Sequence, residues 1–297
     1  MSKTLLLIVN PAAGMGRGRA VKDEICAMYQ SRGWACRVRE TAVWGDASRA
    51  AREESAACDL VLCAGGDGTL SETLNGLTQV PDAPPLCYVP MGSTNDLALS
   101  AGLPRAPLAA AEIGLTGVPR AVDAGSFDGR VFSYVACFGA FSRTSYETDR
   151  TLKNHLGHLA YLLTGVQELG RIQSTPVRVE CDGKGVQGEF LFGAVCNTRS
   201  LGGVLKLPLE QIALQDGRHE VLLVRMPQRL SDLSSLALDL LSGAFEHPLL
   251  SFHSVREAVF HMPGPLPWSL DGERADAGET VRIRNLHHAY RLMLPVP

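Results

Sequence analysis

The residues best suited to chemistry are five consecutive ones, Gly65-Gly66-Asp67-Gly68-Thr69, which follow an apolar run and precede a helix-like segment. Glycines at such a turn let backbone N–H groups approach a phosphate without interference from Cβ atoms, and the following helix N-terminus adds donors and positive dipole. Asp67 is suited to hold magnesium or a water network beside the phosphates. The plainer interpretation is a turn in which Asp67 caps the helix. The five residues together favour the phosphate-binding interpretation.

Two further polar turns follow other apolar runs. Asn10-Pro11-Ala12-Ala13-Gly14 ends the first run, and Pro90-Met91-Gly92-Ser93-Thr94-Asn95-Asp96 ends the fourth. Hydroxyl and amide groups in the later turn suit contacts with phosphates or a base, although Asn95 and Asp96 are also ordinary helix caps. Because all three turns close strands at the same end, we expect them to form one ligand site.

These three turns, in this order and spacing, resemble the diacylglycerol kinase catalytic-domain family, which includes soluble bacterial lipid kinases and sphingosine kinases. The resemblance spans nearly the whole chain. Ser93 stands where the family has threonine, which keeps the hydroxyl, and Thr41 matches a nucleotide-contacting threonine. The resemblance implies that ATP is bound by the following residues: Asn10, Thr41, Gly65, Gly66, Asp67, Gly68, Thr69, Glu72, Ser93, Thr94 and Asn95.

An acidic segment in the second half, Leu270-Asp271-Gly272-Glu273, supports the same resemblance. Taken alone, two carboxylates around a glycine are most often an exposed hairpin. The family's glutamate at this place is the proposed general base. The resemblance therefore implies that Glu273, assisted by Asp271, takes the proton of the lipid hydroxyl while Asp67 serves the metal and the phosphates.

The resemblance also implies two magnesium sites. Ala213 and Arg218, through their carbonyls, and the Asp216 side chain match a structural magnesium loop, whose plainer interpretation is an Asp-Gly turn. Arg218 replaces a residue that is commonly apolar, so a positive charge stands close to the metal. Asp96 and Asp123 match acids thought to join Asp67 around the catalytic metal. His287-His288 near the end is expected at the surface.

The elements that must position these turns alternate along the first 120 or so residues. Apolar runs at Thr4–Asn10, Trp34–Glu40, Asp59–Ala64 and Leu86–Pro90 predict strands, and helix-like segments lie between them. Strand-helix alternation predicts a largely parallel sheet with helices on both faces, and such sheets bind ligands at the carboxyl ends of their strands. The glycine-rich turns fall at those ends.

The second half predicts a mostly antiparallel, sandwich-like β domain with helices. It begins with two strands in Arg120–Phe138, joined at Asp128-Gly129, and a helix at Thr151–Arg171 follows. Further strands are predicted at the following segments: Pro176–Asp182, Gly188–Thr198, Glu220–Arg225, Glu257–His261 and Thr280–Arg284. A helix is predicted at Leu230–Ala244. We expect a nucleotide-binding α/β domain at 1–124 and a lipid-binding β-rich domain at 125–297, with the active site between them. A last strand, Tyr290–Pro295, is expected to return to the first domain.

Composition narrows the functional classes. Eight scattered cysteines without a CxxC pair favour small buried hydrophobic residues in a reducing cytosol, and a net charge of −3 gives no overall attraction to nucleic acid or anionic lipid. The apolar start of the chain is too short for a signal peptide, and no run reaches the length of a membrane helix. We therefore expect a cytoplasmic enzyme that visits the membrane surface for its lipid, binds no nucleic acid, and is compatible with a homodimer.

Two alternatives stay open. An NAD kinase also carries a GGDGT turn after an early strand, although the other two turns argue against it. A non-catalytic nucleotide or lipid sensor on the same fold would be expected to have lost its acids, yet all of them are present: Asp67, Asp96, Asp123, Asp271 and Glu273. Which lipid is used does not follow from the sequence, because apolar pockets are permissive.

Overall fold

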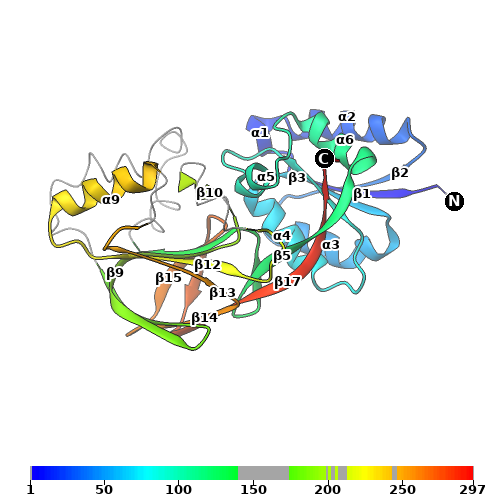
Figure 1. Cartoon of the computed structure of the whole chain (residues 1–297). Coiled ribbons are helices and arrows are strands. Elements are labelled where there is room, and N and C mark those ends of the chain that lie inside the picture. The colour runs from blue at the N-terminus through cyan, green and yellow to red at the C-terminus, as the bar shows by residue number, and fades with distance from the viewer. Residues whose placement is uncertain are drawn as a thin grey trace. The chain divides into compact units, whose positions relative to one another are not determined.

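The computed structural model describes residues 2–139, 174–198, 200–201, 205–206, 213–242 and 246–296. The chain divides into two compact units (Figure 1). Unit 1 contains Met1–Ala124 and His287–Pro297, and unit 2 contains Gly125–Leu286. Two strands, β5 (Val118–Phe127) and β17 (Thr280–Leu294), carry residues of both units.

Unit 1 is built on a sheet in the order β2-β1-β3-β4-β17. β1 (Thr4–Val9), β2 (Ala35–Glu40), β3 (Leu60–Gly65) and β4 (Leu86–Pro90) pair in parallel, and β17 joins β4 through Leu292 and Leu86. β3 is buried along its whole length because helices cover both faces of the sheet, which explains its uninterrupted apolar sequence. The predicted parallel sheet is confirmed.

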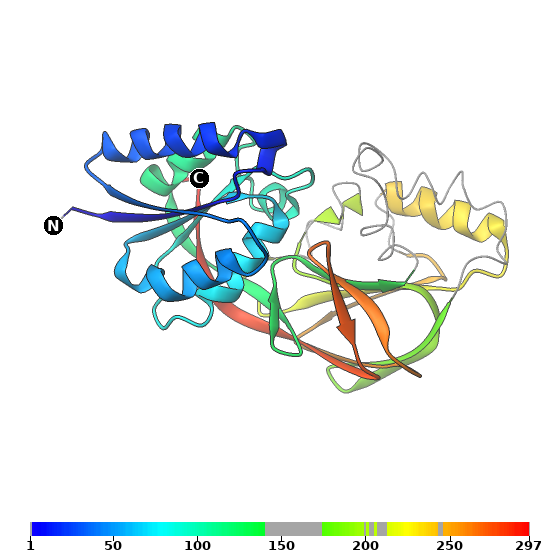
Figure 2. The ribbon, with the colours of Figure 1, turned by 180° about the vertical axis from the view of Figure 1, so that it is seen from behind.

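Helices lie on both faces of this sheet, α2 and α6 on one side and α3 and α4 on the other (Figures 1 and 2). The helical segments are α1 (Ala13–Gly16), α2 (Gly18–Gln30), α3 (Asp46–Glu54), the 3-10 turn η1 (Ser55–Ala57), α4 (Asp67–Leu77), α5 (Asp96–Ser100) and α6 (Pro107–Thr116). The predicted three-layer arrangement is confirmed. α6 was not predicted, because its alanine-rich sequence shows no amphipathic stripe.

Unit 2 is mostly antiparallel, as predicted. Its main path of paired strands runs β16-β15-β7-β9-β8-β14-β17, and β12 pairs with both β9 and β13. The strands are β6 (Arg130–Phe132), β7 (Val135–Gly139), β8 (Thr175–Cys181), β9 (Lys184–Cys196), β12 (His219–Arg225), β13 (Leu250–Val255), β14 (Glu257–His261), β15 (Leu266–Leu270) and β16 (Glu273–Ala277), with a separate ribbon of β10 (Ser200–Leu201) and β11 (Leu205–Lys206).

An aromatic cluster anchors β15 in the core of unit 2. The Trp268 ring is fully buried, and its centroid lies 4.8 Å from that of Phe138 and 5.1 Å from those of Phe127 and Phe260. Such edge and tilted contacts stabilise a core beyond the area that they bury. The hairpin of β15 and β16 therefore starts from a fixed base, which matters because its turn carries Asp271 and Glu273.

Several elements differ from prediction. α9 is described over Leu230–Ser242, within the predicted Leu230–Ala244, and β13, β15 and β16 were not predicted. β17 is one continuous strand where two short ones were predicted, because polar residues in its middle hide the alternation. The predicted helix at Thr151–Arg171 lies outside the described residues. The helices that the structure describes are all too short or too polar to span a lipid bilayer.

Candidate active site

Three loops meet at the carboxyl ends of β1, β3 and β4, which are neighbours in the sheet. The Gly14 N–H donates to the Met91 carbonyl over 2.9 Å, which joins the loop after β1 to the loop after β4. The loops after β3 and β4 touch at two glycines, since a Cβ on Gly92 would lie 2.8 Å from the Gly66 Cα. Only glycine allows two backbones to approach so closely. The structure thus brings the three turns together as one rim.

Asp67 and Asn95 hold this rim in shape. Asp67 Oδ2 accepts the Asn95 N–H over 3.0 Å, and the Asn95 side chain closes back on Gly92 with two hydrogen bonds of 2.8 Å. Asn95 adopts the left-handed backbone conformation, with φ of 55°, which asparagine tolerates better than most residues. Asp67 begins α4, where a helix presents N–H groups that it cannot pair itself. Amide donors and a carboxylate therefore lie side by side, which suits a phosphate group and its divalent cation.

A pocket of about 210 Å³ opens beside the rim. Glu72 Oε2 accepts the Gly45 N–H over 2.8 Å and so holds the loop that carries Thr41 and Trp44. Trp44 is 72% exposed and lines this pocket, where an aromatic ring can contact a planar ligand. The lining contains four of the predicted nucleotide contacts together with neighbours from the same loop: Asn10, Thr41, Ala42, Val43, Trp44, Ala47, Thr69 and Glu72.

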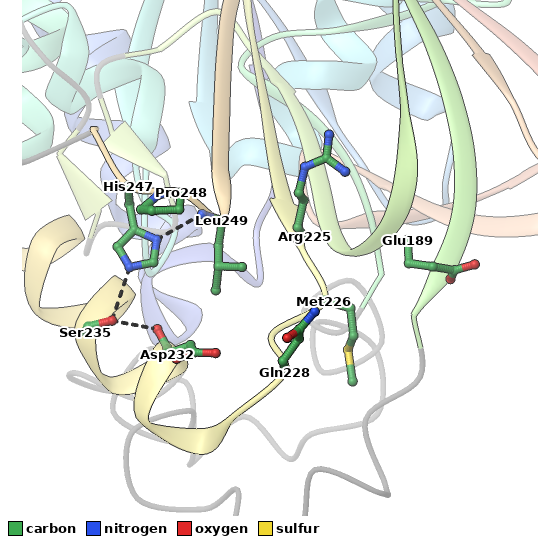
Figure 3. A pocket seen from close by; sticks show the side chains of 9 residues that line it. All are labelled: Glu189, Arg225, Met226, Gln228, Asp232, Ser235, His247, Pro248 and Leu249. Carbon is green, nitrogen blue, oxygen red and sulfur yellow. Dashed lines mark hydrogen bonds between the residues drawn. The ribbon is translucent and has the colours of Figure 1, made fainter.

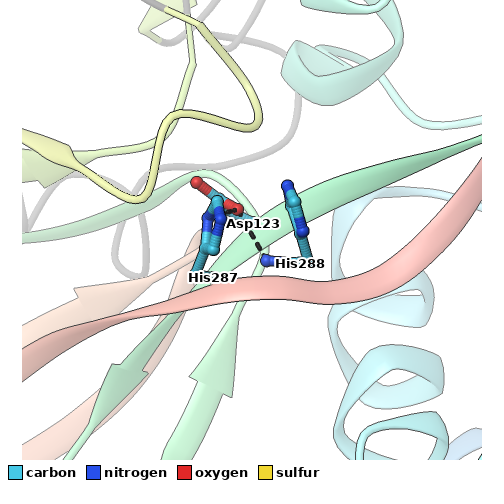
Figure 4. Close-up of side chains that lie close together, drawn as sticks. All are labelled: Asp123, His287 and His288. Carbon is cyan, nitrogen blue, oxygen red and sulfur yellow. Dashed lines mark hydrogen bonds and ion pairs between the residues drawn. The ribbon is translucent and has the colours of Figure 1, made fainter.

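The other predicted residues of unit 1 lie outside that lining. Ser93 is exposed and Thr94 half-buried on the loop after β4. Asp96 and Asp123 are fully buried, Asp96 at the start of α5 and Asp123 on β5. Asp123 Oδ1 accepts the His288 backbone N–H over 2.8 Å and lies 3.1 Å from Nδ1 of His287 (Figure 4). Asp123 therefore has an imidazole beside it that the sequence did not predict.

In unit 2, Asp271 ties the β15–β16 turn to the chain before β7. Its Oδ2 accepts the N–H and the hydroxyl of Ser133, over 2.6 and 3.0 Å, and its Oδ1 accepts the N–H groups of Tyr134 and Val135, over 3.0 and 3.1 Å. Burial raises the pKa of Asp271, and these four donors oppose that shift. Asp271 and Gly272 both have positive φ, as a two-residue hairpin turn requires. A carboxylate surrounded by donors in this way positions the turn.

Glu273 is the exposed end of this turn. It is the first residue of β16 and pairs in register with Leu270. Within the described part of the chain, its carboxylate forms no hydrogen bond or ion pair. Asp271 thus fixes a hairpin whose tip presents an open carboxylate to solvent.

The predicted structural metal loop precedes β12. Asp216 Oδ1 accepts the Arg218 N–H over 2.9 Å, and the Arg218 carbonyl accepts Nδ2 of Asn285 over 3.0 Å while keeping a second lone pair. The Arg218 guanidinium is bonded to Ser254 and Asp182. Burial, followed by the charge of Asp216, raises the pKa of Glu220 to about 7. The negative charge of Asp216 in this loop therefore acts on Glu220, which lies on β12.

A second pocket, of about 650 Å³, lies beside α9 in unit 2 (Figure 3). It has a serine and a histidine in contact, Ser235 Oγ and His247 Nε2 being 3.1 Å apart. Because His247 Nδ1 accepts the Leu249 N–H over 3.1 Å, a neutral ring carries its proton on Nε2 and cannot take one from Ser235. The site is therefore unsuited to a serine nucleophile. Its lining combines polar or charged residues with apolar ones: Glu189, Arg225, Met226, Gln228, Asp232, Ser235, His247, Pro248 and Leu249.

Comparison with known proteins supports the resemblance. Residues 4–127 match the family described as Diacylglycerol kinase catalytic domain, and residues 135–288 match the family described as YegS C-terminal NAD kinase beta sandwich-like domain. A diacylglycerol kinase of Bacillus subtilis (strain 168) is 30% identical over 290 residues, which cover 96% of this chain and 95% of that protein. The chain belongs to the diacylglycerol kinase family.

Two further family members extend the comparison. A diacylglycerol kinase of Staphylococcus carnosus (strain TM300) is 30% identical over 278 residues, 92% of this chain and 89% of that protein. The crystal structure of a diacylglycerol kinase from Bacillus anthracis str. Sterne has a TM-score of 0.75 at 21% identity, and covers 99% of this chain and 97% of that one. The latter shows that the fold is shared along the whole chain.

Sequence reasoning missed three partners of the predicted residues. Trp44 had a local signal, because an aromatic residue stands three residues after Thr41. Ser133 is 138 residues from Asp271, and His287 is 164 residues from Asp123. No local pattern connects residues so far apart, and only the sheet topology brings them together.

Proposed function

We propose that this protein is an ATP- and magnesium-dependent kinase that phosphorylates the hydroxyl of diacylglycerol or a related lipid. The observation that carries the proposal is the rim of unit 1, in which Gly66 touches Gly92 and Asp67 bonds to Asn95. Glycine-rich loops bind phosphates because a phosphate can approach their backbone N–H groups closely, and a nearby carboxylate can bind the cation that accompanies the phosphate. Membership of the diacylglycerol kinase family supports a lipid as the acceptor.

The nucleotide is assigned to unit 1. Its phosphates would lie on the rim, with the hydroxyl groups of Ser93 and Thr94 as further donors. The rest of the nucleotide would enter the pocket of Thr41 and Glu72. Phosphoryl transfer depends mainly on positioning and on neutralising charge, so a site of glycines and carboxylates without a covalent nucleophile is adequate.

Glu273 is assigned as the general base. Its exposed carboxylate would accept the proton of the lipid hydroxyl as that oxygen bonds to the terminal phosphorus of ATP. The bond from phosphorus to the bridging oxygen breaks in the same step, and ADP leaves with the electron pair. Asp271 assists by holding the turn, since its oxygens are already used by four donors.

Magnesium is assigned to two places by the donor groups present. Asp67, with Asp96 and Asp123, would hold the catalytic ion or its waters, and Asp216 with the carbonyls of Ala213 and Arg218 would hold a structural ion. When bound, the catalytic ion would offset negative charge on the transferring phosphoryl group. The lipid acceptor also implies that the enzyme meets its substrate at a membrane surface.

A second candidate is an NAD kinase, because the second family match carries NAD kinase in its description. The two enzymes differ in the acceptor hydroxyl, which belongs to a ribose in one and to a lipid in the other. Labelled ATP supplied with either NAD or lipid micelles separates them. Faster transfer to NAD than to every lipid tested would replace the lipid-kinase proposal.

The main test is transfer from labelled ATP to a panel of lipid alcohols in mixed micelles, with products separated by chromatography. Glu273→Gln keeps the shape of the side chain but cannot accept the proton, so turnover should fall about 100- to 10,000-fold. Nucleotide affinity, measured by direct binding, should be nearly unchanged because the nucleotide contacts belong to unit 1. Asp276→Asn, an exposed carboxylate on the same strand, is the control and should keep full activity. Near-normal turnover of Glu273→Gln would remove the base named here.

A further inference from the structure

The middle of β17 holds two imidazoles against a buried carboxylate. Asp123 on β5 is fully buried, whereas both histidines are exposed. Asp123, His287 and His288 each offer one potential ligand atom, and these three atoms lie within 4.8 Å of one another (Figure 4). The three residues belong to unit 1, so the cluster does not depend on unit 2.

The backbone at His288 creates this cluster. Consecutive residues of a strand normally point to opposite faces of the sheet. His288 instead has φ of 54°, in the left-handed region that a histidine seldom occupies, and the two rings stack with centroids 3.7 Å apart and an angle of 28°. The irregularity therefore turns two neighbouring imidazoles toward one side. The His288 N–H, bonded to Asp123 over 2.8 Å, secures that geometry.

We infer that Asp123, His287 and His288 form a binding site for a divalent transition-metal ion such as Zn²⁺. Two imidazole nitrogens and one carboxylate oxygen are a common donor set for zinc, whereas magnesium prefers oxygen ligands alone. Zinc at about 2.0–2.1 Å from each ligand in tetrahedral geometry keeps the ligand atoms about 3.3 Å apart. His287 Nδ1 and Asp123 Oδ1 are already 3.1 Å apart. The third ligand requires the His288 ring to turn out of its stack on His287.

The ion would take the place of the direct contact between His287 Nδ1 and Asp123 Oδ1. In the metal-bound state both groups coordinate through the same atoms that now face each other, and a solvent molecule completes the fourth position. This site shares Asp123 with the acids assigned to the catalytic magnesium ion, but it adds two imidazole ligands, whereas the magnesium sites of the proposed kinase use oxygen ligands. Its test needs neither nucleotide nor lipid, so it can fail or succeed independently of the proposed function.

The test is competition for Zn²⁺ between the full-length protein and a chromophoric chelator. The variants are H287Q, whose amide can still donate to Asp123, and H288N, whose asparagine tolerates the left-handed backbone. H261Q removes a histidine of unit 2 and is the matched control. Thermal melting without metal establishes that each variant is folded. All proteins share the eight cysteines, so thiol binding adds an equal background to each.

Wild type and H261Q should bind one Zn²⁺ with equal affinity above that background. H287Q and H288N should each bind it at least about 10- to 100-fold more weakly, because losing a direct ligand costs no less than losing a partner of a ligand. Equal affinity in all four proteins, or no binding above the background in wild type, would overturn the site. If one variant fails to fold, the other alone decides between these results.

Discussion

Asp67 combines a hydrogen bond with a charge, and two substitutions separate the roles. Asp67→Asn keeps an oxygen for the Asn95 N–H, 3.0 Å away, but loses the charge, whereas Asp67→Ala loses both. Removing a charge-stabilising group from a phosphate site usually lowers turnover about 100-fold or more, so we expect that loss in both variants. Only Asp67→Ala should also loosen the rim, seen as weaker nucleotide binding than in Asp67→Asn. Turnover above about a tenth of wild type in either variant would contradict the role in charge neutralisation.

Asp271 is expected to matter first for stability. In Asp271→Asn, one carboxylate oxygen becomes an NH₂ group. In one orientation of the amide this group faces the N–H groups of Tyr134 and Val135, and in the other it faces the N–H and the hydroxyl of Ser133. In either orientation at least one buried donor loses its acceptor. Such a loss costs about 1–3 kcal/mol. Chemical denaturation should show it, and turnover should fall less than in Glu273→Gln. Ser133→Ala, which removes one of the four donors, should be destabilised by a smaller amount.

The contradicting outcome is an Asp271→Asn protein that keeps wild-type stability but loses as much turnover as Glu273→Gln. Asp271 would then act in the proton transfer itself, and its four donors would only orient it. Comparing the two measurements on one protein therefore separates positioning from catalysis.

Residue types and spacing were enough to predict which residues form the rim, but not which distant residues hydrogen-bond to the predicted acids. Glycines and acids at strand ends are visible in the sequence because local geometry requires them. The four donors on Asp271 and the imidazole on Asp123 come from distant segments, so they depend on strand order and register. The prediction that His287 and His288 lie at the surface agrees with their exposure, yet it missed the buried carboxylate beside them.

At the scale of elements, the contact of two loops depends on Gly92. A Cβ there would lie 2.8 Å from the Gly66 Cα and 2.8 Å from Asn95 Oδ1, so Gly92→Ala must push the loops apart. Overpacking of this kind costs about 1–3 kcal/mol. We expect a lower melting temperature and nucleotide affinity reduced about 10-fold or more, measured by calorimetry. Gly264→Ala is the control, because a Cβ there meets nothing within 4 Å. Equal behaviour of both variants would show that the loops need not touch.

The sequence predicted the strands correctly where nearly every side chain of the strand is buried, and it failed where buried and exposed side chains are mixed along the strand. The buried strands β1, β3 and β4 are apolar runs bounded by turn residues, and the sequence placed them within one residue at each end. β17 alternates regularly at its start, then carries Asn285, His287 and His288 where the backbone becomes irregular at His288, so the pattern disappears. Mixed polar strands of this kind are recognisable only from their partners.

For the molecule as a whole, the residues proposed to take part in the reaction come from both units. The phosphate rim and Asp67 belong to unit 1, and Glu273 belongs to unit 2. The chain also returns to unit 1 at its end, where Leu292 pairs with Leu86 and is fully buried. Residues far apart in the sequence therefore complete unit 1.

The last prediction concerns this returning segment. Truncation after Leu286 removes the buried side chains of Tyr290, Leu292 and Met293 and exposes one edge of β4. Losing a single large buried side chain already costs about 2–5 kcal/mol, so we expect unit 1 to unfold or aggregate and nucleotide binding to be lost. Thermal melting and calorimetric nucleotide titration measure both effects. Truncation after Leu294 is the control and should behave like wild type, because Pro295 and Val296 are exposed. A protein ending at Leu286 that melts and binds nucleotide as the full chain does would show that unit 1 is stable without this strand, and the end of the chain would then have no part in holding the phosphate rim.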